Sequence, residues 1–179
     1  MKHTPGNGTD VVDMRPFMTE FPTGVAVVTT LEPQGRPWGM TCTSLCSVTL
    51  VPPTLLVCLR DGSPTLAALL SARTFAVNLL HRDARATAEL FASGAPDRFG
   101  RVGWSLPAGC GGPHLRPSAH MIADCELARS MSIGDHIVVA GQVQHVTRTS
   151  ETAPLLYGRR RYASWPDQPP APSGSGGPQ

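Results

Sequence analysis

The stretch that carries most of the information about fold and function is Gly39-Met40-Thr41-Cys42-Thr43-Ser44-Leu45-Cys46-Ser47-Val48-Thr49-Leu50-Val51-Pro52-Pro53. Hydroxyl side chains stand at positions 41, 43, 44, 47 and 49, and a double proline ends the stretch. Short side chains let a ligand lie close to the backbone, and hydroxyl and N–H groups can hold a phosphate. The same residue types are common at strand ends and in turns. Taken alone, the stretch is compatible with a polar turn or with a binding site.

The residues on both sides of this stretch predict strands. Residues 25–31 are rich in β-branched side chains and predict a buried strand. A turn then returns the chain through a second strand at 36–43, where Gly39 indicates a bulge or a close approach of the backbone to another group. The two prolines offer no N–H for a central strand, and a third buried strand is expected at 54–59.

Two helices are predicted in the middle of the chain. Ser63 suits the N-cap of a helix over 64–72, with Pro64 at its first position. Its buried face is expected to consist of Leu66, Leu69 and Leu70. Asp83 is expected to cap a second helix over 84–93, which Gly94 ends.

Further strands follow these helices and alternate with them. Residues 75–80 are apolar except for Asn78, whose amide needs a hydrogen-bond partner, either backbone or ligand, if it is buried. A long loop at 95–117, of a kind that is often functional or mobile, precedes the later strands. These later strands are expected at 119–127, 136–147 and 154–162.

This order of elements predicts the fold class. It favours a mainly β, mostly antiparallel barrel or split sheet with a few helices at its ends. A parallel doubly wound sheet is excluded, because most strand pairs have no helix between them. We expect one domain over 10–165, between a polar segment at 1–9 and a Pro/Gly/Ser-rich tail at 166–179, both disordered.

The composition restricts the function classes. A net charge of +2 gives no reason to expect nucleic-acid binding. The five cysteines form no CxxC pair, so no metal site is predicted, and they are expected to be reduced. No apolar run approaches ~20 residues, and the N-terminus lacks the apolar core of a signal peptide. We therefore expect a soluble, cytoplasmic protein.

Few familiar motifs occur in the chain. It contains no GxGxxG, GxxxxGK[ST], GxSxG or HExxH pattern, so neither a Rossmann nor a P-loop site is supported. His136 opens a predicted strand, where a histidine is either an exposed turn residue or a ligand contact. Arg159, Arg160 and Arg161 form either a solvated edge or a group that attracts phosphate.

Six motifs follow one another along the chain. They are Phe21-Pro22-Thr23-Gly24-Val25-Ala26-Val27-Val28-Thr29-Thr30, Gly39-Met40-Thr41-x-x-Ser44-x-x-Ser47-Val48-x-Leu50-x-Pro52-Pro53, Phe75-Ala76-Val77-Asn78, Asp97-Arg98-Phe99, Gly134-Asp135-His136 and Pro154-Leu155-Leu156-Tyr157. In this order they resemble the flavin reductase family, the small reductase components of two-component flavin monooxygenases. The resemblance covers roughly residues 13–163.

The resemblance implies an FMN-binding split β-barrel, Greek-key-like, that acts as a homodimer with flavin sites near the subunit interface. Flavin contacts are then expected from Gly39, Met40, Thr41, Cys42, Thr43, Ser44, Ser47, Val48, Ser63, Thr65, Asn78 and Phe99. His136 matches the histidine associated with the nicotinamide and is the one catalytic residue expected. Tyr157 and Tyr162 would border the same pocket.

The activity implied is hydride transfer from NADH or NADPH to FMN or FAD. The reduced flavin would then pass to a flavin-dependent monooxygenase or halogenase. The chief alternative is a non-catalytic flavin- or haem-binding split-barrel protein. A pyridoxamine-phosphate oxidase-like enzyme is a third possibility, but it would bind the FMN phosphate with several basic residues, and the segment 41–47 has none.

Overall fold

The computed structural model describes residues 12–166 of the chain. The segments predicted to be disordered, 1–9 and 166–179, lie outside these residues except for Pro166. Within residues 12–166, no helix is long and apolar enough to cross a membrane.

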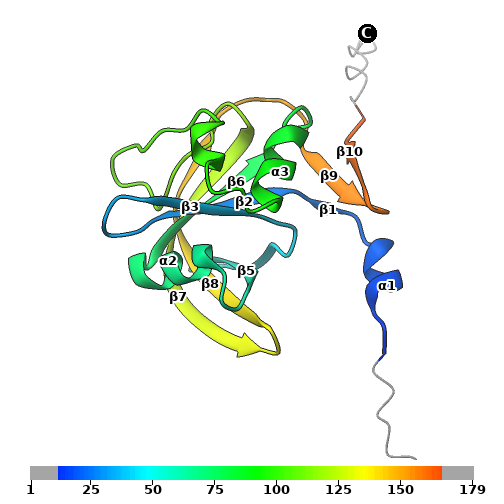
Figure 1. Ribbon diagram of the computed structural model, residues 1–179, viewed down its shortest axis with the longest axis horizontal. Coiled ribbons are helices and arrows are strands. Elements are labelled where there is room, and N and C mark those ends of the chain that lie inside the picture. Colours follow the sequence, from blue (N-terminus) through cyan, green and yellow to red (C-terminus); the bar gives the residue numbers. More distant parts are fainter. Residues whose placement is uncertain (1–11, 167–179) are drawn as a thin grey trace, which may run out of the picture.

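Seven antiparallel strands form the main sheet (Figure 1). In spatial order they are β3 (Pro37–Cys42), β2 (Ala26–Leu31), β6 (Thr74–Leu80), β7 (Ala119–Ile133), β8 (His136–Arg148), β5 (Pro53–Arg60) and β4 (Cys46–Leu50). Strands β3 and β4 form its two edges, so the sheet is not closed into a barrel. The prediction of a mainly β, mostly antiparallel split-barrel fold is confirmed.

A smaller sheet and three helices complete the fold. The small sheet has the order β1 (Thr23–Gly24), β9 (Leu155–Gly158) and β10 (Arg161–Ser164). The helices are α1 (Arg15–Thr19), α2 (Pro64–Ala72) and α3 (Arg85–Ala92). Figure 1 shows α2 and α3 against the β2–β3 end of the main sheet, whereas α1 stands apart beside the β9–β10 turn.

The core lies where α2 and α3 meet β2. From Ala26 to Thr30 this strand is buried without interruption, as its β-branched sequence predicts. Leu66 and Leu69 of α2 are also buried, and Ser63 caps the helix by accepting a hydrogen bond from the N–H of Leu66 at 3.3 Å. The predicted burial of Leu70 is wrong, because this side chain is 38 % exposed.

Two glycines mark close approaches within the sheet. A Cβ on Gly141 of β8 would clash with the ring of Phe75, which explains the glycine in this long strand. Opposite Gly141, the neighbouring strand is irregular, because the register shifts between Leu127 and Arg129. Gly39 pairs in regular register with Thr29, so it marks a close approach and not a bulge.

Three other expectations need correction, and one strand was not expected. Asp83 does not cap α3, which has no side-chain cap; the backbone N–H of Asp83 donates to His81 Nδ1 at 3.2 Å. The strand predicted at 119–127 continues to Ile133. The strand predicted at 154–162 is the hairpin β9–β10. Residues 46–50 form the edge strand β4, which the sequence did not predict because all five side chains are exposed and no burial pattern marks them.

Candidate active site

A crevice of about 280 Å³ opens between β3 and the start of α2, and we call it the β3–α2 crevice. Its lining residues are Arg36, Trp38, Gly39, Met40, Thr41, Ser63, Pro64, Thr65, Phe91, Ala92, Gly94, Pro96 and Arg98. Five of the predicted flavin contacts are therefore brought together here: Gly39, Met40, Thr41, Ser63 and Thr65.

The position of Gly39 depends on its missing side chain. A Cβ at this residue would lie 3.0 Å from Cε1 of Phe91 and 3.1 Å from Cγ2 of Thr29. The glycine therefore lets Phe91 of α3 pack directly against β3 at this wall of the crevice.

Two arginines supply positive charge to the crevice. The guanidinium of Arg36 lies 4.2 Å from the centroid of the Trp38 ring, and that of Arg98 lies 5.9 Å from it. Burial lowers the pKa of Arg98, and the positive charge of Arg36 lowers it further. Within residues 12–166 neither arginine has a carboxylate partner.

Arg98 is the strongest sign of an anionic ligand. It is only 7 % exposed, and its Nε has no hydrogen-bond partner among the described residues, although Nη1 donates to the carbonyl of Ala95 at 3.0 Å. A buried, unpaired cationic N–H is costly unless a ligand satisfies it. A phosphate group fits this donor set, which the hydroxyls of Ser63 and Thr65 at the start of α2 would extend.

A second hollow, of about 390 Å³, lies between α1 and the β9–β10 hairpin, and we call it the α1–β9 hollow. Its lining residues are Arg15, Met18, Thr19, Phe21, Thr23, Thr43, Ser44, Tyr157, Gly158, Arg159 and Arg160. Thr43 and Ser44 follow directly after β3, so the stretch 39–44 lines the crevice at one end and this hollow at the other.

Several side chains of the stretch 41–48 are engaged by the protein itself. Thr41 donates its hydroxyl to the carbonyl of Ala88 at 2.6 Å, and Cys42 is buried, which raises the pKa of its thiol. Ser44 Oγ donates to the carbonyl of Cys58 at 2.9 Å and accepts from its N–H at 3.1 Å. Ser47 and Val48 lie exposed on the edge strand β4, outside both hollows.

The side chain of Asn78 is buried and forms its hydrogen bonds with the protein itself. It is 0 % exposed, and its amide joins β2 to the buried loop segment 111–115. Nδ2 donates to the carbonyls of Val27 and Pro113 and to Thr29 Oγ1, and Oδ1 accepts from the N–H of Leu115. Its partners are therefore backbone groups and one hydroxyl, and Asn78 is left out of the site proposed below.

The other predicted residues lie at separate places. Phe99 packs edge-on against Phe91, with ring centroids 5.1 Å apart, and supports the wall of the crevice from behind. Tyr157 borders the α1–β9 hollow, and its ring centroid lies 5.2 Å from that of Tyr162, whose ring also lies near Arg85 of α3. His136 lies at the β7–β8 turn, which touches the turn before α2 through a hydrogen bond from Asp61 N–H to Asp135 O at 2.9 Å.

The His136 side chain is exposed, and among residues 12–166 it bonds only to the neighbouring Asp135. Its Nδ1 lies 2.8 Å from Asp135 Oδ1, and this hydrogen bond lowers the pKa of the Asp135 carboxyl. The single chain therefore does not bring His136 together with Tyr157 and Tyr162, although the resemblance assigned all three to one pocket.

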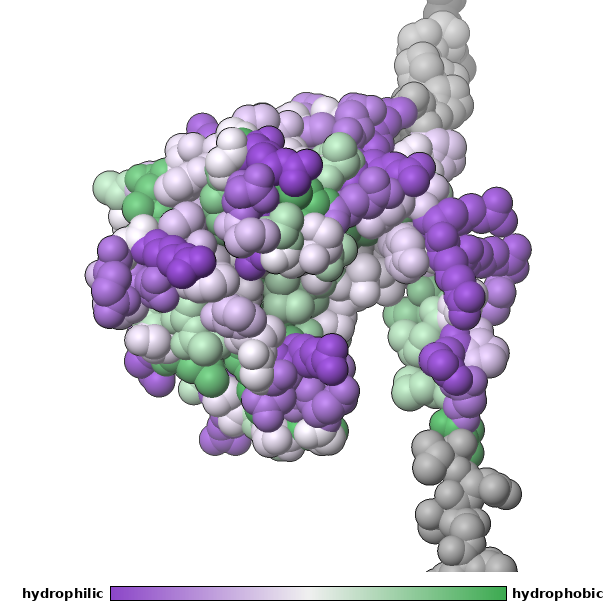
Figure 2. Space-filling model, in the orientation of Figure 1, coloured by the Kyte–Doolittle hydropathy of each residue, from purple (hydrophilic) through white to green (hydrophobic). Residues whose placement is uncertain are grey.

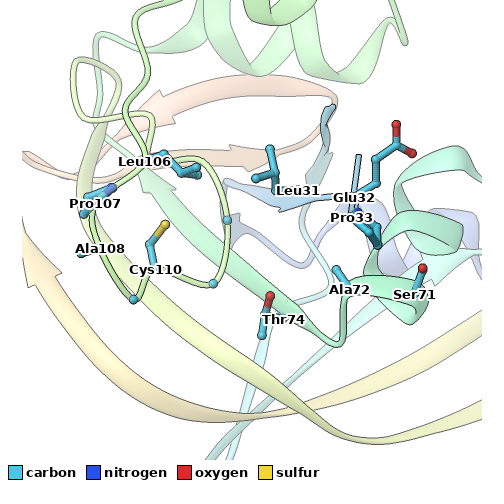
Figure 3. Close-up of a pocket in the computed structure, with 13 residues that line it drawn as sticks. Leu31, Glu32, Pro33, Ser71, Ala72, Thr74, Leu106, Pro107, Ala108 and Cys110 are labelled. Atoms are coloured by element: carbon cyan, nitrogen blue, oxygen red, sulfur yellow. The ribbon is translucent and has the colours of Figure 1, made fainter. Parts of the chain in front are cut away.

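A third hollow, of about 550 Å³, contains none of the predicted residues. Figure 3 shows its walls, the loop from Leu106 to Cys110 on one side and Leu31 to Pro33 with the end of α2 on the other. It has no arginine in its lining and no unpaired buried donor, so we do not assign the active site to it.

Comparison with known proteins agrees with this geometry. The flavin reductase like domain family matches residues 18–166. The chain belongs to this family. A flavin reductase (NADPH) from Lentzea aerocolonigenes is 49% identical over 161 residues, which are 90% of this chain and 94% of that protein.

Two solved flavin reductase structures are similar to the chain as well. An NADH:FAD oxidoreductase from Streptomyces globisporus, in complex with NAD and FAD fragments, has 31% sequence identity and a TM-score of 0.79, covering 93% of this chain and 99% of that one. The flavin reductase component of a bacterial two-component tryptophan halogenase has 31% identity and a TM-score of 0.77, covering 87% and 98%. The predicted family and enzyme class, an NAD(P)H:flavin oxidoreductase, are confirmed.

The sequence did not indicate every lining residue of this flavin reductase. Arg98 stands in one of the six motifs, but only the fold shows that this residue is buried and lines the crevice. Arg36 and Trp38 follow a turn and carry no motif, so no sequence signal separated them from ordinary strand residues.

Proposed function

We propose that this chain transfers a hydride from NADH or NADPH to FMN or FAD at a site that runs along the stretch 39–44. The flavin phosphate would lie in the β3–α2 crevice, and the ring would extend toward the α1–β9 hollow. The observation that carries this proposal is that one extended stretch lines both hollows. The four residue-to-residue steps from Met40 to Ser44 span about 13 Å of extended chain.

The crevice end is suited to the phosphate. Arg98, which lines the crevice, would donate a guanidinium N–H to a phosphate oxygen, and Arg36 would add a second positive charge. The hydroxyls of Ser63 and Thr65 lie at the same wall. A ligand phosphate there would stabilise the cationic form of the buried Arg98, which burial disfavours on its own.

The ring end is suited to a flat, uncharged group. Thr43 and Ser44 are short and lie at the surface of the hollow. The bound flavin supplies the acceptor for the hydride that the nicotinamide releases. Backbone N–H groups in this stretch would stabilise the negative charge that the flavin gains, without any acid or base catalyst.

His136 is proposed to orient the nicotinamide dinucleotide. Its imidazole is exposed, and Asp135 holds Nδ1, which leaves Nε2 free to contact a ligand. Tyr157 lines the α1–β9 hollow, which does not include His136 of the same chain. We therefore propose that the two residues serve one bound dinucleotide only within a homodimer.

The homodimer is proposed to form through the edge strand β4. All five of its residues are exposed, and Leu50 and the adjacent Val51 are 82 % and 87 % exposed. Met131 and Ile133, near the β7–β8 turn, are each 55 % exposed. An apolar edge strand of this kind invites pairing with a second copy.

A partner enzyme would use the product. We propose that the reduced flavin passes to a flavin-dependent monooxygenase or halogenase, by analogy with the halogenase reductase to which the chain is similar. A cytoplasmic location is proposed because all five cysteines are free thiols.

A steady-state assay tests the activity. The purified protein is combined with NADH or NADPH and, in turn, with FMN, FAD and riboflavin, and the consumption of the nicotinamide is followed. We expect consumption only when a flavin is supplied or already bound. A protein that binds flavin but never oxidises either nicotinamide would be the non-catalytic binder instead.

A further inference from the structure

We propose that Arg160, in the β9–β10 turn, binds a phosphate group of the nicotinamide dinucleotide in the α1–β9 hollow, an inference that rests on the proposed function. Arg15 and Arg159 line the same hollow and would support Arg160. None of the flavin contacts predicted from the sequence includes these arginines.

The backbone of the turn is unusual for arginine. Arg159 and Arg160 have φ values of 50° and 57°, in the left-handed region that residues other than glycine, asparagine and aspartate rarely adopt. The pairing of Arg161 with Gly158 makes them the two central residues of a hairpin turn. Asn-Gly or Gly-Gly would form such a turn at lower cost, so the two arginine side chains need another reason to be there.

The turn is fastened to α1. Arg159 donates two hydrogen bonds to Oε2 of Glu20, at 2.8 Å from Nε and 2.7 Å from Nη2, and its backbone N–H donates to the carbonyl of Thr19 at 2.9 Å. This contact fixes the turn over the hollow. Figure 2 shows hydrophilic surface gathered where the hairpin meets α1.

The two carboxylates near Arg160 are already paired with other arginines. Two carboxylates face this corner: Glu20 pairs with Arg159, and Asp13 pairs with Arg15 at 2.7 Å. Arg160 has no hydrogen bond or ion pair with any of residues 12–166. The guanidinium of Arg160 is therefore unpaired among these residues and can bind an anion in the hollow.

The identity of the anion follows from the neighbours of Arg160. Thr43 and Ser44 line the same hollow and belong to the stretch proposed to hold the flavin ring, and Tyr157 lines it as well. The nicotinamide must reach that ring, so the phosphate groups of the same dinucleotide would extend toward Arg160. Its pyrophosphate is common to NADH and NADPH, whereas the 2′-phosphate is present only in NADPH.

Isothermal titration of the full chain with NAD⁺ and with NADP⁺ tests this assignment, because it measures dinucleotide binding whether or not flavin is reduced. Arg160→Gly removes the guanidinium and keeps a residue that suits the turn, so its melting temperature should equal or exceed that of the wild type. Arg160→Asn is a second variant that tolerates the same backbone. The control is Arg161→Ala, which removes an equal charge on the opposite side of the hairpin, away from the hollow.

We expect Kd to rise about tenfold in both Arg160 variants, as for one lost charge-assisted hydrogen bond, and to stay unchanged in Arg161→Ala. A rise for both dinucleotides identifies the pyrophosphate as the ligand, and a rise for NADP⁺ alone identifies the 2′-phosphate. Unchanged binding of both, or an equal weakening in Arg161→Ala, overturns the proposal. A wild type that binds NADP⁺ through Arg160 but reduces no flavin would contradict the proposed function alone.

Discussion

Gly39 faces the ring of Phe91 so closely that a Cβ on residue 39 would lie 3.0 Å from Cε1 of that ring. The contact joins the floor of the β3–α2 crevice to helix α3, because Phe91 is buried between them. Any side chain at position 39 must therefore move α3 or fill the crevice.

Gly39→Ala is expected to lower the free energy of unfolding by about 1–3 kcal/mol through overpacking and to weaken flavin binding. Urea unfolding and titration with FMN measure the two effects. Gly24→Ala serves as the control, since a Cβ there meets no atom within 4 Å. Equal effects of the two substitutions would show that the contact with Phe91 has no special role.

Arg98→Met is expected to weaken the binding of FMN about tenfold or more and to leave riboflavin, which lacks the phosphate, nearly unaffected. The change removes the unpaired Nε–H but keeps much of the buried volume. Flavin fluorescence titrations give both dissociation constants. Arg101→Met, in the same loop but exposed, is the control. A parallel loss of riboflavin binding would mean that Arg98 only supports the loop.

His136→Ala is expected to raise KM for the nicotinamide about tenfold, with a smaller effect on KM for flavin. The reason is that His136 is proposed to orient the dinucleotide and not to bind flavin. Steady-state kinetics with each substrate varied in turn measure both constants. His145→Ala, an exposed histidine on the same strand, should change neither. Equal rises in the two KM values would rule out the assigned role.

Leu50→Lys is expected to convert the protein from dimer to monomer, because it places a charge on the apolar edge strand β4. Sedimentation velocity at several concentrations measures the mass. Leu106→Lys adds the same charge at an exposed leucine on the loop and should leave the mass unchanged. A wild type that sediments as a monomer would contradict the proposed homodimer.

Asn78→Ala is expected to lower the free energy of unfolding by about 3 kcal/mol, since it leaves the buried N–H of Leu115 without a partner and removes the amide donor to Val27 and Pro113. Gln144→Ala, an exposed amide on β8, should change it by less than about 0.5 kcal/mol. If Asn78→Ala instead kept its stability and lost flavin affinity, Asn78 would belong to the flavin site after all.

The sequence predicts the elements that carry a local signal. Ser63 and Pro64 mark the start of α2, and the β-branched run at 26–30 marks the buried strand β2. The sequence does not predict strand β4, because an edge strand with every side chain exposed has no burial pattern. Asp83 was wrongly assigned as a cap, since its backbone N–H and carboxylate face His81 instead.

The candidate site could be predicted only in part. The residue types single out the stretch 39–53, but only its first part, 39–44, lines the two hollows. The sequence suggested a phosphate site without fixed charge, whereas the fold adds Arg36 and Arg98 from outside the segment. Contacts of this kind join residues that are distant in the chain, and no local pattern reveals them.

The central claim is that this chain reduces flavin with a nicotinamide. Its most direct test is a single-turnover experiment without oxygen, in which the protein and one equivalent of FAD or FMN are mixed with excess NADPH or NADH and the absorbance of oxidised flavin is followed. We expect that absorbance to disappear rapidly, with one nicotinamide oxidised per flavin. Bleaching no faster than in the same mixture without protein would contradict the account.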